Sequence, residues 1–563
     1  MASTRPGWAR WQASRAPTVD GFDLKQASLL LLAAVILAGC PQRSGARDGG
    51  SRTIVVRSPQ EPDGLNPYLT GMSAAVDAYQ PIFSGLLAVD DKMAFVPDLA
   101  LDVPTEENGG VATEGKGMVV TYHLRKGVKW HDGEPFTSKD VAFTQRVIAD
   151  PKVLVVERQG HDLIDRVETP DPYTAKVHFK EVYAPYLQLF KAILPAHILE
   201  HEADLNHAAF NRSPIGTGPF KFDNWRSGDR LAYKANPYYF RGTPAFDRLE
   251  FKVVPDDNAA FVQLKNGVID VYQTVNLSQY RAVEKLDGVK IYSTPALLWE
   301  HLSFNTEKPY FQDVKVRQAI ALAIDKNVLA DKVYDGVYKP AWCDQNPLSW
   351  AYSPDLVNDW PYSPERARKL LDEAGWKPGA DGVRSKDGKR FSVSFSTTAG
   401  KKNRETAQLL IRHFLKQVGI EVKIANYAGV SLFGAYPNGI IKSGKFDMAM
   451  WAWESGPDPD NLNSWHSERI PPNGSNQTRY RNKDLDKVLE AATRTFRQPE
   501  RQALYRKASH ILAKDLPNIP LLYWTVLDAA STRLEGFRPN PSSAGNLWNV
   551  YEWRPKATTA RPS

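Results

Sequence analysis

The sequence predicts a mixed α/β fold built from several domains. The chain has 563 residues, and domains usually hold about 100–200 residues, so we expect two to four of them. Short segments that alternate like strands are interspersed irregularly with longer segments of helical periodicity. No segment repeats at a fixed period, which argues against a solenoid. Hydrophobic residues make up 42% and charged residues 24% of the chain, which excludes a largely disordered chain and a multi-span membrane protein.

Strands are predicted where apolar and polar residues alternate or where β-branched residues follow one another. Residues 52–58 read RTIVVRS, a β-branched run typical of a strand. Within residues 118–129, the apolar Val120, Tyr122 and Leu124 alternate with polar residues, which predicts a half-buried strand. Two further strands are expected at 173–179 and 519–524.

Helices are predicted from apolar faces of period 3.6 and from their end signals. Thr137 is a good N-cap, and Asp140 completes a variant of the capping box for a helix through Val147. The remaining expected helices are 259–266, 314–332, 364–374 with Ser363 as cap, 403–418, and 485–515 with a break at Pro499.

The net charge is +7, but it is distributed unevenly. Residues 1–39 hold four basic and two acidic side chains, and the last ten residues add three basic ones. The rest of the chain is nearly balanced, with no basic stripe interleaved with aromatic residues. Nucleic-acid binding is therefore not indicated.

The N-terminus has the features of an export signal. Residues 29–39 form an apolar run that is too short for a stable membrane span, and a net-positive segment precedes it. The run ends in Leu-Ala-Gly before Cys40, which resembles the lipobox of bacterial lipoproteins. The resemblance implies a signal peptide at 1–39, a lipid on Cys40, and export to the periplasmic or extracellular face of a membrane. Residues 40–51 are polar and rich in glycine, so we expect a flexible tether.

The chain has two cysteines, Cys40 and Cys343. If Cys40 carries a lipid, Cys343 has no partner for a disulfide, and a protein of this size relies on its core instead. No acid or base motif surrounds Cys343, so we expect it to act as a semi-buried small hydrophobic residue.

Four sequence blocks occur in order along the chain. They are 122–136 (YHLRKGVKWHDGEPF), 215–222 (IGTGPFKF) followed by 236–239 (NPYY), 302–305 (LSFN) followed by 313–320 (DVKVRQAI), and 458–461 (DPDN). Together they resemble the extracellular solute-binding proteins of family 5, the oligopeptide- and dipeptide-binding lipoproteins of peptide ABC transporters. The resemblance runs from about Thr53 to about Phe537.

The resemblance implies a two-lobe periplasmic-binding-protein-like class II fold with an extra inserted domain. Hinge segments would let the two lobes close over a ligand. The expected parts are lobe one at 52–85, 214–297 and 516–555, the inserted domain at 86–213, lobe two at 298–515, and a disordered tail at 556–563.

The same resemblance implies capture of a peptide in the interlobe cleft and delivery to a permease and ATPase complex. We expect a monomer without a cofactor. The matching positions for backbone pairing with an extended peptide are Gly71, Met72, Ser73, Ala452, Trp453 and Glu454. Trp451 and Trp453 share one face of a strand, which either lines the cleft or packs in the core.

One position departs from the family pattern. Peptide-binding members have an Asp, shortly after the position of Trp453, that receives the ligand's α-ammonium, and Gly456 occupies that place here. Glu454 or Asp458 could supply the charge from a shifted position. If neither does, the ligand could be a non-peptide solute such as a nickel complex, a sugar or an opine. A receptor-like sensor is a further alternative.

An enzymatic interpretation has one candidate motif. His197, Glu200 and His201 fit the H-x-x-E-H pattern of a zinc peptidase, with His207 as a conceivable further ligand. The segment also matches an ordinary stretch of the binding-protein family, where it holds no metal. The chain contains no G-x-S-x-G elbow and no P-loop. We therefore expect no catalytic or metal-binding residues, with the zinc protease as a remote alternative.

Overall fold

The computed structural model describes residues 52–542 and 544–556, all within the compact unit Gly50–Ser563. The predicted signal peptide, the lipidation site Cys40, the tether and residues 557–563 of the tail lie outside the described residues. The fold is mixed α/β, as predicted.

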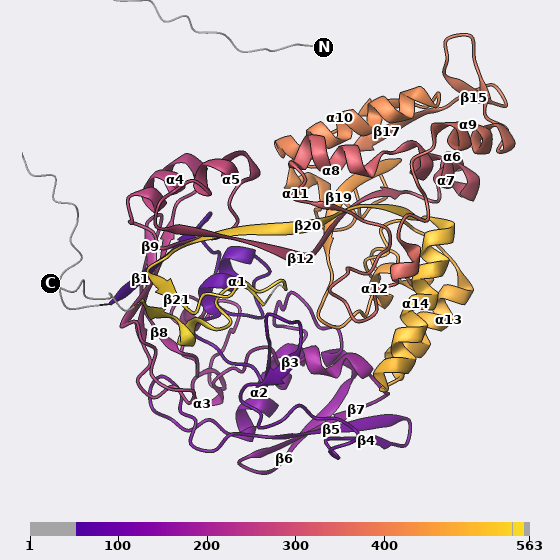
Figure 1. Cartoon of the computed structure of the whole chain (residues 1–563). Helices are drawn as coiled ribbons and strands as arrows, with labels where there is room; N and C mark the ends of the chain where they lie inside the picture. The colour runs from indigo at the N-terminus through magenta and orange to yellow at the C-terminus, as the bar shows by residue number, and fades with distance from the viewer. Residues whose placement is uncertain (1–51, 543, 557–563) are drawn as a thin grey trace, which may run out of the picture. The chain divides into compact units, whose positions relative to one another are not determined.

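The centre of the fold is an eleven-stranded sheet with the order β18-β17-β19-β12-β20-β11-β1-β10-β9-β8, in which β13 also pairs with β20. Two long antiparallel strands, β12 (Val289–Phe304) and β20 (Asn518–Ser531), run side by side through it (Figure 1). The other strands are β1 (Thr53–Ser58), β8 (Phe220–Arg226), β9 (Arg230–Ala235), β10 (Arg248–Val253), β11 (Val271–Tyr272), β13 (Lys339–Pro340), β17 (Ser392–Ser396), β18 (Glu421–Ile424) and β19 (Met448–Glu454).

Four smaller sheets complete the β structure. The largest has the order β4-β5-β7-β6 and contains the predicted strand around Tyr122. The strands of the small sheets are β2 (Leu87–Val89), β3 (Phe95–Pro97), β4 (Val111–Glu114), β5 (Gly117–His123), β6 (Ile164–Asp171), β7 (Thr174–Phe179), β14 (Lys377–Pro378), β15 (Arg384–Lys386), β16 (Lys389–Arg390), β21 (Leu534–Glu535) and β22 (Arg554–Pro555).

Several helices begin where the cap residues predict. Asp140 Oδ2 accepts a hydrogen bond from Thr137 N at 2.9 Å at the start of α2. Ser363 accepts from Arg366 N at the start of α9. The α-helices are α1 (Ser73–Tyr79), α2 (Ser138–Ala149), α3 (Ala196–Leu199), α4 (Asp257–Lys265), α5 (Leu277–Val283), α6 (Pro309–Gln312), α7 (Val314–Ala323), α8 (Lys326–Tyr334), α9 (Pro364–Glu373), α10 (Lys402–Gln417), α11 (Gly429–Leu432), α12 (Leu462–Trp465), α13 (Lys483–Arg494) and α14 (Gln498–Asp515). Short 3-10 helices are η1 (His161–Leu163), η2 (Ala184–Gln188), η3 (Ala209–Asn211), η4 (Pro354–Leu356), η5 (Ser467–Arg469) and η6 (Val550–Glu552).

The single helix predicted at 314–332 is wrong, because the structure has two helices there. The chain leaves the helical conformation at Ile324 and Asp325, both of which are extended. Asp325 then caps α8, because its side chain accepts from Asn327 N and Val328 N. An Asp that bonds the following backbone N–H groups favours a new helix start over continuation.

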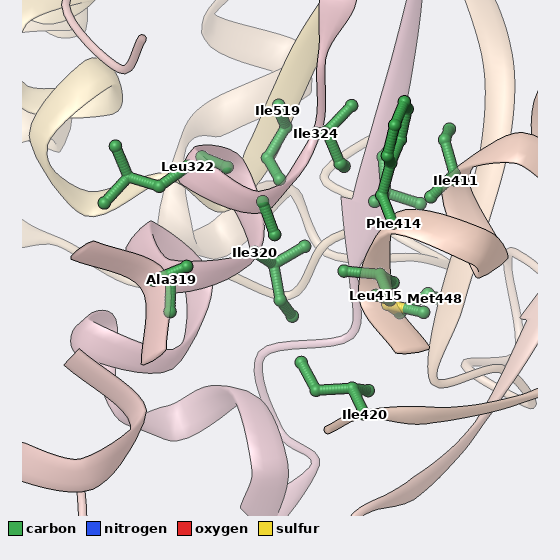
Figure 2. Close-up of a cluster of buried hydrophobic side chains, with 14 of the residues drawn as sticks. Ala319, Ile320, Leu322, Ile324, Ile411, Phe414, Leu415, Ile420, Met448 and Ile519 are labelled. Atoms are coloured by element: carbon green, nitrogen blue, oxygen red, sulfur yellow. The ribbon is translucent and has the colours of Figure 1, made fainter. Parts of the chain in front are cut away.

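Three large hydrophobic clusters are buried in this unit. One lies between residues 302 and 522, one contains residues from 54–271 and 530–553, and one lies between 86 and 193. In the first, Ile320 of α7, Phe414 of α10 and Met448 of β19 lie close together (Figure 2). Cys343 is a free thiol, as predicted, but it is 2% exposed and so is buried more deeply than the semi-buried position expected. The boundaries of the lobes and of the inserted domain stay predictions.

Candidate functional site

A cavity of about 640 Å³ lies among segments that are distant in the sequence. This volume is in the range of small-molecule and peptide-side-chain pockets. Its walls come from 67–98, from 156–161 with 183–192, from 454–460, and from 542–551 with parts of 219–241. Of the predicted site residues, Gly71, Glu454 and Asp458 line this cavity, and Met72, Ser73, Trp451, Ala452 and Trp453 do not.

Gly71 lies in the wall just before α1. Its backbone N–H and C=O make no hydrogen bond to any residue that the structure describes. The next two residues belong to the start of α1: Met72 O accepts from the N–H groups of Ala75 and Val76, and Ser73 is the first residue of the helix. Among these neighbouring positions, Gly71 therefore presents backbone groups to the cavity.

Trp451 and Trp453 belong to an aromatic cluster behind this wall. Trp451 is 2% exposed and contacts His301, with ring centroids 4.6 Å apart. Trp453 is half-buried and lies 5.8 Å from Trp299 and 5.4 Å from Trp465. In this structure, the shared face of these tryptophans packs against β12 side chains and α12, and the cavity wall begins after them, at Glu454.

The open edge of β19 can be read from its pairing with β12. Ser455 N donates to Leu297 O, and Trp453 pairs with Trp299. Backbone groups alternate sides along an antiparallel strand, so those of Ala452 point away from β12. The strand on that other side, β17, pairs with β19 only at Met448 and Ala449. The edge of β19 at Ala452 thus extends beyond its neighbour.

Asp458 is held by a buried ion pair. Arg501 of α14 donates to both carboxylate oxygens, at 2.7 and 2.8 Å. The two side chains are only 6% and 8% exposed. Asp460 N also donates to Asp458 Oδ1 at 3.0 Å. The charge of Asp458 is neutralised by the protein itself, so this residue holds the 455–461 turn in place.

Asp460 lines the cavity and was not among the predicted site residues. Its carboxylate accepts from Gln159 at 3.2 Å and from Leu462 N at 3.1 Å. Burial raises the pKa of Asp460 to about 6, and the neighbouring carboxylate of Asp458 adds to the rise. Glu157, His161 and Lys191 also line the cavity. Asp460 belongs to the DPDN block, whereas nothing in the local sequence around the other three marks them as a site.

The zinc-peptidase motif does not form a metal centre in this structure. His197 Nε2 lies 2.9 Å from Asp132 Oδ2, and His201 is 82% exposed at its side chain. The helix that carries the motif, α3, covers only Ala196–Leu199. Within 52–542 and 544–556, no three His, Cys, Asp or Glu side chains converge closely enough to hold one metal ion. In the same part of the chain, no helix is long and apolar enough to cross a membrane.

Comparison with known proteins places the chain in a defined group. The model of the bacterial extracellular solute-binding proteins, family 5, matches residues 94–469. The oligopeptide-binding protein AppA of Bacillus subtilis is 32% identical over 550 residues, which cover 94% of this chain and 98% of AppA.

Solved structures agree with this result. The structure of AppA from Bacillus subtilis in complex with a nonapeptide has a TM-score of 0.74 at 31% identity, covering 90% of this chain and 99% of that one. The structure of NikZ from Campylobacter jejuni in complex with Ni(L-His) has a TM-score of 0.76 at 27% identity, covering 89% and 99%. The two-lobe binding-protein fold expected from the sequence blocks is thereby confirmed.

Proposed function

This chain belongs to the bacterial extracellular solute-binding proteins of family 5, and we propose that it captures peptides in the cavity and delivers them to the permease of an ABC importer. The observation that carries the proposal is the free backbone of Gly71, which lies in the wall of the same cavity as the 454–460 segment. The peptide-bound relative AppA supports the choice of ligand.

An enclosed peptide must find partners for its own backbone. Each buried N–H or C=O without a hydrogen bond costs a few kcal/mol. Gly71 offers one donor and one acceptor that no described residue uses, and the lack of a side chain lets a ligand backbone approach closely. Backbone pairing of this kind binds peptides of many sequences, and side-chain pockets then add selectivity. The open edge of β19 at Ala452 is a second candidate for such pairing.

The relative that holds Ni(L-His) defines the rival ligand class. A nickel chelate needs no extended backbone partner. A bound peptide therefore needs the backbone groups of Gly71 as hydrogen-bond partners, whereas a nickel chelate does not.

The partners follow from the same proposal. A permease would accept the peptide from the binding protein, and a separate ATPase would supply the energy. A lipid on Cys40 would hold the protein at the membrane, and the tether at 40–51 would let it reach the permease. We propose that the protein acts as a monomer.

Calorimetric titration with peptides of two to nine residues tests the proposal. We expect 1:1 binding that Gly71→Pro weakens about tenfold or more, because proline removes one backbone donor. Gly71→Ala keeps the N–H but adds a methyl group beside Val156, so it separates the loss of the donor from the loss of close approach. Binding of Ni(L-His) without binding of any peptide would contradict the proposal.

A further inference from the structure

His161 presents a fixed hydrogen-bond acceptor to the cavity. The side chain is 7% exposed and lies in the cavity wall. Gln145 Nε2 donates to His161 O at 2.9 Å, so Gln145 Oε1 is the atom that faces His161 Nδ1 at 2.7 Å. That oxygen can only accept, and Nδ1 therefore carries the proton.

The remaining nitrogen, Nε2, thus has a lone pair and no hydrogen-bond partner among the described residues. Burial, together with the charge of Lys191, lowers the pKa of His161 to about 3. The ring is neutral at physiological pH. An acceptor in a cavity wall that no protein group satisfies can take a hydrogen bond from a ligand donor.

Two carboxylates lie in the same cavity without an ion-pair partner. Glu157 and Asp460 form no salt bridge with any residue in the described part of the chain. Gln159 connects their two segments, because its side chain donates to Asp460 Oδ2 at 3.2 Å and it lies between Glu157 and His161 in the chain. The three acceptors therefore lie on adjoining segments of the cavity wall.

The other charges of the cavity are mostly neutralised. Asp98 pairs with Arg241 at 2.8 Å, and Asp458 pairs with Arg501. Lys191 keeps an exposed side chain in the cavity wall. The ammonium group of Lys191 thus lies in the same cavity wall as the carboxylates of Glu157, Asp460 and Glu454 and the acceptor of His161.

No set of three His, Cys, Asp or Glu side chains within 52–542 and 544–556 is close enough to ligate one ion. A polyatomic cation is larger and carries several donors, three on an ammonium and five on a guanidinium.

We propose that His161 Nε2, Glu157 and Asp460 form an acceptor subsite that takes a cationic side chain of the bound peptide, so that the protein favours peptides containing Lys or Arg. The proposal rests on the proposed function, because it assigns the ligand's side-chain chemistry within the same cavity. Hydrogen bonds from a charged donor to a carboxylate are about twice as strong as neutral ones. Acidic peptides would meet like charges and bind worst.

Calorimetry with three matched pentapeptides tests the subsite: Ala-Ala-Lys-Ala-Ala, Ala-Ala-Gln-Ala-Ala and Ala-Ala-Glu-Ala-Ala. We expect the Lys peptide to bind roughly 10- to 100-fold more tightly than the Gln peptide, as charge-assisted bonds predict. Glu157→Gln with Asp460→Asn should remove most of this preference, measured as the ratio of Lys-peptide to Gln-peptide affinity. Asp165→Asn, an exposed carboxylate outside the cavity, is the matched control and should change nothing.

Lys191→Met keeps the test decisive if the Asp460 variant fails to fold. Removing this competing ammonium should raise the ratio of Lys-peptide to Gln-peptide affinity several-fold. Equal affinity of the wild type for all three peptides would overturn the subsite while leaving peptide binding intact. Failure of all three peptides to bind, alongside failure of the two- to nine-residue series, would instead overturn the proposed function.

Discussion

The ion pair between Asp458 and Arg501 offers a sharp test of how the cavity wall is built. We propose the substitution Arg501→Met, which keeps much of the side-chain volume and removes the charge. Arg501 donates to both Asp458 oxygens and also to Ala492 O and Tyr505 Oη. Without it, the Asp458 carboxylate would remain in a buried site with the N–H of Asp460 as its main donor.

The expected loss follows from the burial of the pair. Removing one partner of a buried ion pair typically costs about 3–5 kcal/mol, because the other charge is left uncompensated. Removing both charges costs less. We therefore expect Arg501→Met to lower the free energy of unfolding by about 3–5 kcal/mol, and Asp458→Asn with Arg501→Met to recover about 1–3 kcal/mol of that loss.

Urea unfolding followed by circular dichroism at pH 7.5 measures both values. The midpoints should fall in the order wild type, double variant, single variant, with similar slopes. If the double variant is as unstable as the single one, the uncompensated charge is not the cause. If Arg501→Met loses less than about 1 kcal/mol, the pair does not hold the turn.

Three other predictions concern pH, membrane attachment and closure. Burial and the charge of Asp528 raise the pKa of Asp77 to about 7. Between the ordinary pKa of an aspartate and pH 7, Asp77 ionises in the unfolded chain but not in the folded one, so the free energy of unfolding falls as pH rises. Asp77→Asn should therefore add about 1–3 kcal/mol more to the free energy of unfolding at pH 8 than at pH 5, and an equal effect at both pH values would refute this. Cys40→Ser should release the protein from membranes, and a variant that stays bound after a carbonate wash would count against the lipid anchor. Small-angle scattering should show a smaller radius of gyration with saturating peptide, because a ligand that touches both lobes favours the closed state; an unchanged radius would speak against hinge closure.

Local signals in the sequence predicted much of the secondary structure. The capping box at Thr137 and the cap at Ser363 depend on residues within one turn of the helix start, so they can be read directly. The break at Ile324 could not be read from the apolar period, which continues across it. The strand at 519–524 extends in the structure to Ser531, because its pairing with β12 stabilises residues that have no strand pattern of their own.

Site residues could be predicted from the sequence only where they belong to, or are matched through, the sequence blocks of the family. Gly71 and the 454–458 segment came from the family resemblance, and Asp460 falls within the DPDN block. The period-two spacing of Trp451 and Trp453 shows that they share a face, but it cannot show what covers that face. His161 and Lys191 reach the cavity through the tertiary arrangement of short loops, which leaves no periodic trace in the sequence.

Native mass spectrometry of the untagged protein as purified would identify the ligand that the cavity holds. We expect a 1:1 adduct whose ejected ligand fragments as a peptide, enriched in Lys and Arg, and a complex that exchanges with added Lys pentapeptide. An adduct with the mass of a metal chelate, a sugar or an opine that added peptides do not displace would contradict this expectation.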